Sequence, residues 1–202
     1  MNVPKSSLDF SHYPVMLKEV IKISEPDKGG TFIDCTFGGG GYSKEILKFS
    51  NTSVIALDQD LIAEDKSKTI KEKYFKRFIF FKEKFSNLDT IISSNYKADV
   101  IIFDLGVSSF QLKDMSRGFS FKSKEKIDMN MGLSSISAEE VINNYTEKDL
   151  KMILKVFGEE KEAFKIVKNI IRARKIKRIT KVQELVDIII KSKKKNFFKK
   201  IN

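Results

Sequence analysis

A run of glycines and two acidic residues at the ends of apolar segments form the most informative chemical pattern in this sequence. Four consecutive glycines at 38–41 follow an apolar stretch, 31–37, that contains Asp34. A second apolar run, 53–57, ends in Asp58, 24 residues after Asp34. A backbone without side chains lets a ligand approach closely, and an acid at the tip of the next strand can accept both ribose hydroxyls of a nucleoside. The pattern therefore predicts a site for an adenosine-containing cofactor.

The position of Asp34 favours a cationic cofactor over a dinucleotide. Asp34 lies four residues before Gly38, which gives D-x-x-x-G-x-G instead of the usual dinucleotide pattern. A carboxylate at that place would repel a pyrophosphate, but it could bond an ammonium group directly or through water. S-adenosylmethionine, with its sulfonium, ammonium and ribose groups, fits these requirements. The alternatives are a flexible glycine hinge and a nicotinamide dehydrogenase. This sequence has no histidine placed to transfer a proton, which argues against a dehydrogenase.

An aromatic side chain follows the third apolar run of the sequence. Phe85 comes just after the run 77–81, so it is expected at the carboxyl edge of the sheet, where open α/β sheets bind their ligands. We expect Phe85 to cover the adenine ring, with an ordinary core phenylalanine as the alternative.

The segment after the fourth apolar run carries the candidate reacting groups. Asp104 ends the run 98–103, Gly106 permits a turn, and Ser108 and Ser109 add two hydroxyls. An exocyclic base amine is a poor nucleophile, and hydrogen bonds from its N–H groups to such acceptors would return electron density to nitrogen. Asp104, Ser108 and Ser109 are therefore the candidate catalytic residues. A simple Asx-type turn is the alternative interpretation.

Short apolar runs alternate with helical patterns over the first half of the chain, which predicts an α/β fold with a parallel sheet. The fourth strand is expected to remain an unpaired apolar edge. Strands are predicted at 31–37, 53–57, 77–81 and 98–103, and helices at 18–23, 43–47, 61–76 and 86–94.

The second half of the chain has a different character. Residues 110–133 resemble a loop, and helical periodicity begins at Ser137. Capping patterns predict helices that open at Ser137, Thr146 and Thr180, with Gln183 completing the last cap and Gly158 ending the second helix. We interpret 137–191 as a small helical domain.

Charge and composition limit the classes of partner. The chain of 202 residues carries a net charge of +11, and residues 161–202 hold 15 lysines and arginines against 3 acids. A basic surface of this kind favours nucleic acid, and a lysine-rich solvated helix face is the alternative. One cysteine, Cys35, and one histidine, His12, argue against disulfides and metal sites. No segment is typical of a membrane span or signal peptide, so a cytoplasmic location is expected.

Several motifs in order resemble one family, the S-adenosylmethionine-dependent methyltransferases (MraW-like) that modify N4 of a cytosine in bacterial 16S ribosomal RNA. The resemblance extends from His12 to the C-terminus. The matching segments are HYPVMLKEV at 12–20, DCTFGGGGYS at 34–43, LDQD at 57–60, DLGVSSFQL at 104–112, RGFSF at 117–121, DMNM at 128–131, FGEE at 157–160 and ITKVQEL at 179–185.

The resemblance implies a class I methyltransferase, Rossmann-like α/β fold with an inserted all-α domain. It implies the domains 1–112 (cofactor-binding half), 113–136 (connecting loop), 137–191 (helical insert) and 192–202 (basic tail). The implied substrate is 16S rRNA within the small ribosomal subunit, without metal or membrane. By motif position the implied cofactor contacts are Gly40, Gly41, Tyr42, Asp58, Phe85, Asp104 and Gln111.

The sequence also departs from this family. Tyr42 stands where the family commonly has histidine, and Asn130 stands where it has arginine. Family members continue for roughly another hundred residues, so we expect this chain to be a truncated form with an incomplete sheet. A non-catalytic remnant that binds S-adenosylmethionine or RNA without turnover is therefore the alternative function. The oligomeric state is open, with a homodimer as one alternative.

Overall fold

A computed structural model describes residues 14–92 and 97–193, and it divides the chain into two compact units. The sheet unit consists of the residues up to Gly106 together with Met131–Leu133. The helical unit consists of Val107–Asn130 and the residues from Ser134 onward. Each unit is described by itself.

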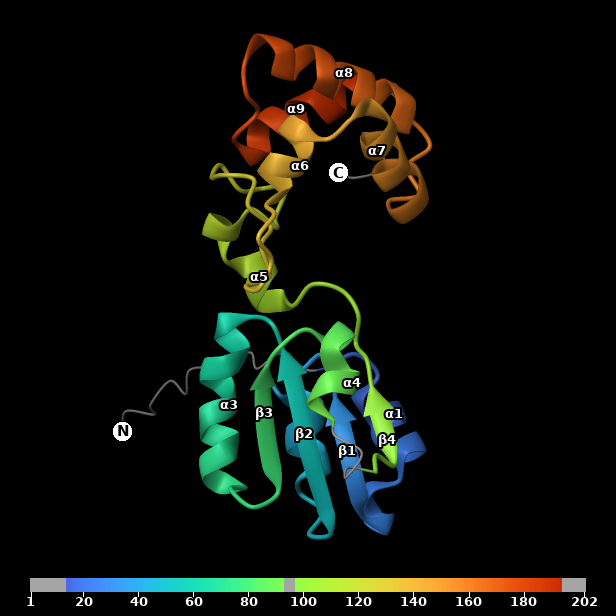
Figure 1. Cartoon of the computed structure of the whole chain (residues 1–202), viewed down its shortest axis with the longest axis vertical. Helices are drawn as coiled ribbons and strands as arrows, with labels where there is room; N and C mark the ends of the chain where they lie inside the picture. Colours follow the sequence, from blue (N-terminus) through green and yellow to red (C-terminus); the bar gives the residue numbers. More distant parts are fainter. Residues whose placement is uncertain (1–13, 93–96, 194–202) are drawn as a thin grey trace, which may run out of the picture. The chain divides into compact units, whose positions relative to one another are not determined.

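The sheet unit is built on four parallel strands in the order β3-β2-β1-β4 (Figure 1). After β1 the chain adds β2 and β3 on one side and then returns to add β4 on the other side of β1. The strand order therefore reverses between β1 and β4, which is where open α/β sheets place their ligands. The strands are β1 Gly30–Asp34, β2 Thr52–Asp58, β3 Phe78–Lys82 and β4 Val100–Ile102.

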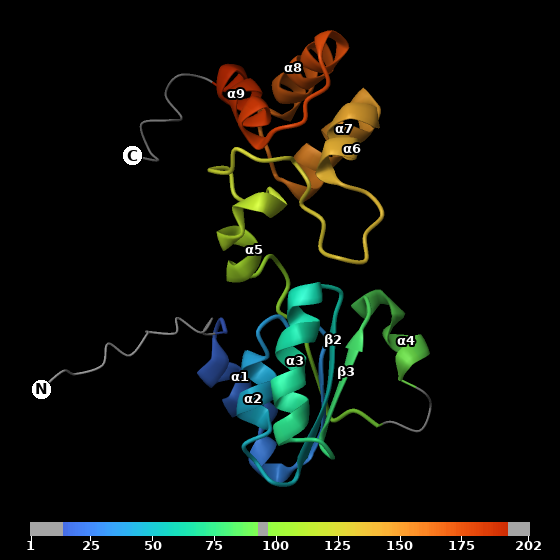
Figure 2. The ribbon, with the colours of Figure 1, turned by 90° about the vertical axis from the view of Figure 1, so that its left-hand side faces the viewer.

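Helices cover the two faces of this sheet unequally. The main core lies beneath α1, α2 and α3 on one face, and α4 lies on the other (Figure 2). The alternation of strand side chains explains this division, because Phe32 and Val54 enter the main core while Ile33 and Ile55 meet α4. The helices are α1 Leu17–Ser24, α2 Gly41–Ile46, α3 Leu61–Lys73 and α4 Leu88–Ile91.

The outer strands expose apolar side chains on the face that carries α4. Ile79 and Phe81 of β3 are 41% and 37% exposed, and Ile101 of β4 and Phe103 just after it are 47% and 49% exposed. In the described part of the chain β4 pairs only with β1. The expectation of an apolar edge strand is therefore confirmed for these residues, as is the predicted α/β class with a parallel sheet.

The helical unit has its own core, formed where α6, α7, α8 and α9 meet. Ile142, Leu150, Val167 and Val182 are buried in it, one from each helix. Ile127 of the preceding segment completes the cluster. The elements are α5 Ser109–Lys113, α6 Ala138–Asn144, α7 Glu147–Met152 with a π-helical turn at Ile153–Phe157, α8 Ala163–Ile176 and α9 Val182–Ser192.

Two of the three predicted helix caps are confirmed. The hydroxyls of Ser137 and Thr146 accept hydrogen bonds from the third backbone N–H of α6 and α7, and Gly158 ends the turn after α7. The third prediction is wrong. A cap at Thr180 would start the helix at residue 181, but α9 begins at Val182. Glu184, not Gln183, supplies the cap by accepting the backbone N–H groups of Thr180 and Lys181 at 2.9 and 3.1 Å.

The loop expected over 110–133 contains short helical segments. α5 and a 3-10 turn at Met115–Arg117 lie within it. The signal for α5 was the capping box from Ser108 to Gln111.

Some predictions fall outside what the structure tests. Residues 194–202 of the predicted basic tail and His12 lie outside the described residues. The domain boundaries at 112, 136 and 191 stay predictions. Among the residues that are described, none of the helices combines the length and apolar character needed to cross a bilayer.

One partly buried hydrogen-bond network stabilises the amino-terminal end of the sheet. The guanidinium of Arg77 donates to the carbonyls of Phe49 and Thr52 at 2.8 and 2.9 Å and to that of Leu47 at 3.0 Å. Leu47 and Phe49 belong to the turn between α2 and β2 and Thr52 is the first residue of β2, so Arg77 joins this segment to the start of β3.

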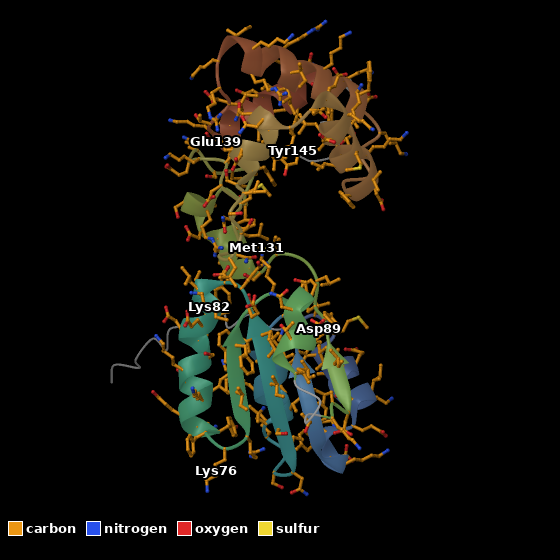
Figure 3. The ribbon with its side chains drawn as sticks, viewed as in Figure 1. Lys76, Lys82, Asp89, Met131, Glu139 and Tyr145 are labelled. Atoms are coloured by element: carbon orange, nitrogen blue, oxygen red, sulfur yellow. The ribbon has the colours of Figure 1, made fainter. Side chains whose placement is uncertain are left out.

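We expect Arg77→Met to lower the free energy of unfolding by about 2–4 kcal/mol, because it removes charge-assisted hydrogen bonds to three backbone carbonyls. Lys76→Met is the matched control, since Lys76 is exposed at the same end of β3 (Figure 3). Denaturant unfolding followed by circular dichroism measures both. Equal stability of the two variants would show that the network contributes nothing.

Candidate cofactor-binding site

The glycine loop connects the carboxyl end of β1 to the start of α2. Its first part is tied back to the sheet, because the backbone N–H of Phe37 donates to Leu57 of β2 at 3.0 Å. A tight turn follows, in which the N–H of Gly40 donates to the carbonyl of Phe37 at 2.7 Å. Helix α2 begins at the next residue. The loop thus lies at the carboxyl edge of the two central strands.

Asp58 joins this loop to the end of β2. One of its carboxylate oxygens accepts the backbone N–H of Gly38 at 2.7 Å, and the other accepts that of Asp60 at 2.9 Å. Burial raises the pKa of Asp58, against the lowering effect of these hydrogen bonds. A carboxylate has about four lone-pair sites, so Asp58 retains the capacity to accept hydroxyl donors as well. The structure therefore brings together the two features that the sequence singled out.

The glycines of the loop differ in what surrounds them. A Cβ on Gly41 would lie 2.1 Å from a ring carbon of Pro14, and one on Gly40 would lie 2.7 Å from both Phe37 and Ile70. A Cβ on Gly38 would meet nothing closer than 3.9 Å. Gly40 and Gly41 are thus required by packing within the protein. Gly38 has a φ of 52°, and the space beside its Cα is open.

Asp34 supports the glycine loop from the interior of the protein and does not face solvent. Its side chain is fully buried, and it accepts the hydroxyl of Ser43 at 2.7 Å and the backbone N–H of Thr36 at 3.3 Å. Burial raises the pKa of Asp34 to about 6, although the Ser43 hydrogen bond lowers it in part. The expectation that Asp34 bonds an ammonium group of the ligand is thus without support. Sequence reasoning missed Ser43, whose signal was its place in the first turn after the glycines.

Tyr42 and Asp104 meet beside the glycine loop. The Tyr42 hydroxyl donates to the carbonyl of Val15 at 2.5 Å and to the Asp104 carboxylate at 3.3 Å. Burial and the charge of Asp104 raise the pKa of Tyr42 to about 12, so the phenol keeps its proton. The backbone N–H of Asp104 donates to the hydroxyl of Thr36 at 2.7 Å. Asp104 is therefore placed next to the loop from the neighbouring strand, as predicted from its position after β4.

Phe85 lies at the same edge, after β3, and it has an aromatic partner. Its ring is 43% exposed, and it contacts that of Phe103 edge to face, with the centroids 5.6 Å apart. This exposure excludes the core-phenylalanine alternative. Phe103 was missed by the sequence reasoning, although it directly precedes Asp104. Nearby, Lys82 at the end of β3 pairs with Glu64 at 3.3 Å (Figure 3).

Ser108, Ser109 and Gln111 belong to the helical unit, where the first and third of them build a capping box. The backbone N–H of Ser108 donates to the Gln111 side chain at 2.8 Å, and the N–H of Gln111 donates to the Ser108 hydroxyl at 3.3 Å. Gln111 is 7% exposed and Ser109 is the first residue of α5. These bonds show a structural role for both groups. The contacts of all three with cofactor or substrate stay predictions.

The described residues hold no group of three or more histidine, cysteine, aspartate or glutamate side chains that could bind a metal ion. The site is therefore an arrangement of backbone N–H groups, two carboxylates and two aromatic rings. The Asp58 carboxylate can accept further hydrogen bonds, and the exposed Phe85 side chain offers an apolar face.

A family model described as the MraW methylase family matches residues 9–202. The chain belongs to the MraW methylase family. Relatives agree with this assignment. Proteins named "Ribosomal RNA small subunit methyltransferase H" from Rickettsia bellii (strain OSU 85-389) and Orientia tsutsugamushi (strain Ikeda) are 43% and 42% identical to the chain over 178 residues. The protein of that name from Neorickettsia sennetsu is 38% identical over 201 residues.

The length of the match differs between the chain and these relatives. The Rickettsia and Orientia alignments cover 88% of this chain but 58% and 57% of the relatives. The Neorickettsia alignment covers 98% of the chain and 68% of the relative. The chain thus spans about three fifths of the length of the first of these proteins.

The buried carboxyl of Asp34 makes stability depend on pH. Its pKa is about 6 in the folded chain against an ordinary value of 3.8, so the folded chain binds more protons at this position between these values. Stability from this group is therefore highest below about pH 4 and falls as pH rises to 6, by about 3 kcal/mol on the scale of 1.36 per unit. We expect wild-type stability to fall by that amount relative to Asp34→Asn, measured by denaturant unfolding at each pH.

A second variant separates this effect from other titrating groups. Ser43→Ala removes the hydroxyl that lowers the Asp34 pKa, so it should extend the falling segment to higher pH. Parallel pH curves for the wild type and Asp34→Asn would contradict the assignment.

Proposed function

We propose that this chain carries the cofactor-binding part of an S-adenosylmethionine-dependent methyltransferase that acts on cytosine N4 of small-subunit ribosomal RNA. The 2.7 Å hydrogen bond from Gly38 to Asp58 is the observation that carries the proposal, because it joins the glycine loop to an acid at the tip of the next strand. Membership of the MraW methylase family and the names of the relatives support methyl transfer to ribosomal RNA. The cytosine N4 position follows from the motif resemblance.

The residues fit the proposed cofactor on three counts. Open space beside Gly38 admits a ligand to the backbone. The Asp58 carboxylate has acceptor capacity for the two ribose hydroxyls. The exposed ring of Phe85 offers an apolar surface for the adenine. When bound, S-adenosylmethionine supplies a methyl carbon bonded to a positively charged sulfur, which leaves as a neutral thioether.

Asp104 is the group that we propose acts on the substrate amine. Its carboxylate lies beside the glycine loop and receives a hydrogen bond from Tyr42, which holds its orientation. A hydrogen bond from the exocyclic amine to Asp104 would raise the electron density on nitrogen, and the Asp104 carboxylate would accept the N–H proton that the amine loses on methylation. Positioning of this kind is worth more than any single acid–base step. Ser108 and Ser109 would offer further acceptors from the start of α5.

The ribose contact can be tested without any reaction. We expect Asp58→Ala to abolish heat release in a titration with S-adenosylmethionine, because it removes the hydroxyl acceptor and releases the Gly38 N–H. Asp89→Ala is the matched control, since Asp89 is an exposed acid of the same unit on α4 (Figure 3). Unchanged affinity of Asp58→Ala would remove that residue from the site, and tight binding of NAD by the wild type would favour the dehydrogenase alternative.

Methyl transfer itself decides between the enzyme and the non-catalytic remnant. We expect the chain to transfer labelled methyl groups from S-adenosylmethionine to small-subunit RNA, with the label in N4-methylcytidine after digestion. Asp104→Asn should lower the transfer rate by about a hundredfold, the lower range for a lost acid–base group. Binding of S-adenosylmethionine without any transfer, by a chain three fifths the length of its relatives, would instead support the remnant.

A further inference from the structure

Helix α8 presents a continuous basic stripe to solvent. Phe164, Lys168, Arg172 and Lys175 recur at spacings of four, four and three residues, so they lie on one side of the helix. All four are exposed, whereas Ile166, Val167 and Ile170 of the opposite side are buried in the core of the helical unit. We call these four residues the α8 stripe. It extends about 16 Å along the helix at 1.5 Å per residue.

Phe164 stands between two lysines at one end of the stripe. The ammonium of Lys151, from α7, lies 4.5 Å from the centre of its ring, and that of Lys168 lies 6.0 Å from it. The ring is nevertheless 57% exposed. An exposed aromatic ring is costly in water, and with both cations in place more than half of the Phe164 surface remains open to a flat partner.

The other basic residues of α8 form an ion pair or hydrogen bonds within the protein, whereas the basic residues of the stripe form no salt bridge in the described part of the chain. Lys165 pairs with Glu162 at 2.6 Å, and Arg174 donates to the carbonyls of Ile142 and Tyr145 at 2.7 and 2.8 Å. Within the described residues, Lys168, Arg172 and Lys175 form no salt bridge. α8 itself contains no acid.

The acid that faces the stripe comes from α7. Glu147 is paired with Lys151 at 2.6 Å. Its pKa is lowered, chiefly by the hydrogen bond from Lys151 and further by the charges of Lys168 and Lys175. The charge around this carboxylate is therefore positive overall, and a polyanion would meet net attraction.

We propose that the α8 stripe together with Lys151 binds single-stranded RNA, with Phe164 stacking on an unpaired base while Lys168, Arg172 and Lys175 contact phosphates. An aromatic platform within a row of cations is the arrangement by which proteins hold single strands. A duplex would offer phosphates but no base face to the ring, and an acidic peptide would use the cations but not the ring. The choice of RNA over DNA rests on the proposed function.

The chain offers a direct probe of stacking, because it contains no tryptophan. Phe164→Trp therefore introduces a single fluorophore at the proposed contact. We expect titration with a twelve-nucleotide single-stranded oligoadenylate RNA, without S-adenosylmethionine, to quench its fluorescence. Phe157→Trp is the matched control, since Phe157 is 76% exposed in the same unit but carries no cation–π contact within the described residues. Equal quenching of both tryptophans, or of neither, would overturn the stacking contact.

Two further variants separate stacking from charge. Phe164→Ala should weaken binding of the oligonucleotide about tenfold, within the range for one lost base stack, and leave the salt dependence unchanged. The double variant Lys168→Ala with Arg172→Ala should reduce the slope of log affinity against log salt by about 1.4, which is 0.7 for each lost phosphate contact. Lys71→Ala with Lys76→Ala removes the same charge from exposed positions of the sheet unit and should leave that slope unchanged.

The outcome is independent of methyl transfer. Quenching of Phe164→Trp by the oligoadenylate in a chain without transferase activity would reject the proposed function and keep the RNA surface. Full transferase activity, together with wild-type affinity of Phe164→Ala for the oligoadenylate, would reject the RNA surface and keep the proposed function. Binding of polyglutamate or of an RNA duplex as tightly as the single strand would reject the surface as a single-strand site.

Discussion

The arrangement of the sheet unit depends on one constraint, the fixing of a glycine-rich backbone between two carboxylates. Asp58 holds the loop from the end of β2 through the N–H of Gly38, and Asp34 holds it from the end of β1 through Ser43. Glycine loops lose much conformational entropy when they are ordered. The hydrogen bonds to the Asp58 carboxylate help to offset that cost, because hydrogen bonds to charged acceptors are stronger than neutral ones. Everything proposed for cofactor binding requires the loop to be held in this way.

Packing against the loop explains why neighbouring glycines are not equivalent. Gly40 and Gly41 are closed in by Phe37, Ile70 and Pro14, while Gly38 faces open space. The loop is thus supported on one side and accessible on the other. Tyr42 extends this support to Asp104, so the groups proposed to hold the cofactor and the group proposed to act on the base share one hydrogen-bonded structure. The basic residues of the α8 stripe belong to the helical unit, and Asp58 and Asp104 belong to the sheet unit.

Prediction from sequence succeeded where a pattern reports a local preference. Alternating apolar runs located the four strands, and Ser137 and Thr146 marked helix starts, because a hydroxyl before a helix bonds to a backbone N–H three residues away. It failed at the cap of α9 and at Asp34. Glu184 supplied the cap of α9 instead of Gln183 because its carboxylate reaches two backbone N–H groups and Lys177 as well. Asp34 was expected at the ligand, but its neighbours on the sheet bury it.

The sequence alone determined the α/β order of elements, the place of the glycine loop after the first strand, and the concentration of positive charge in the last fifth of the chain. These follow from residue type and spacing, which act within a few residues. The tertiary structure decided which carboxylates remain accessible, which glycines face open space, that Phe85 meets Phe103, and which lysines of α8 stay unpaired. Such properties depend on segments that are far apart in the chain and come together only on folding, so no local pattern encodes them.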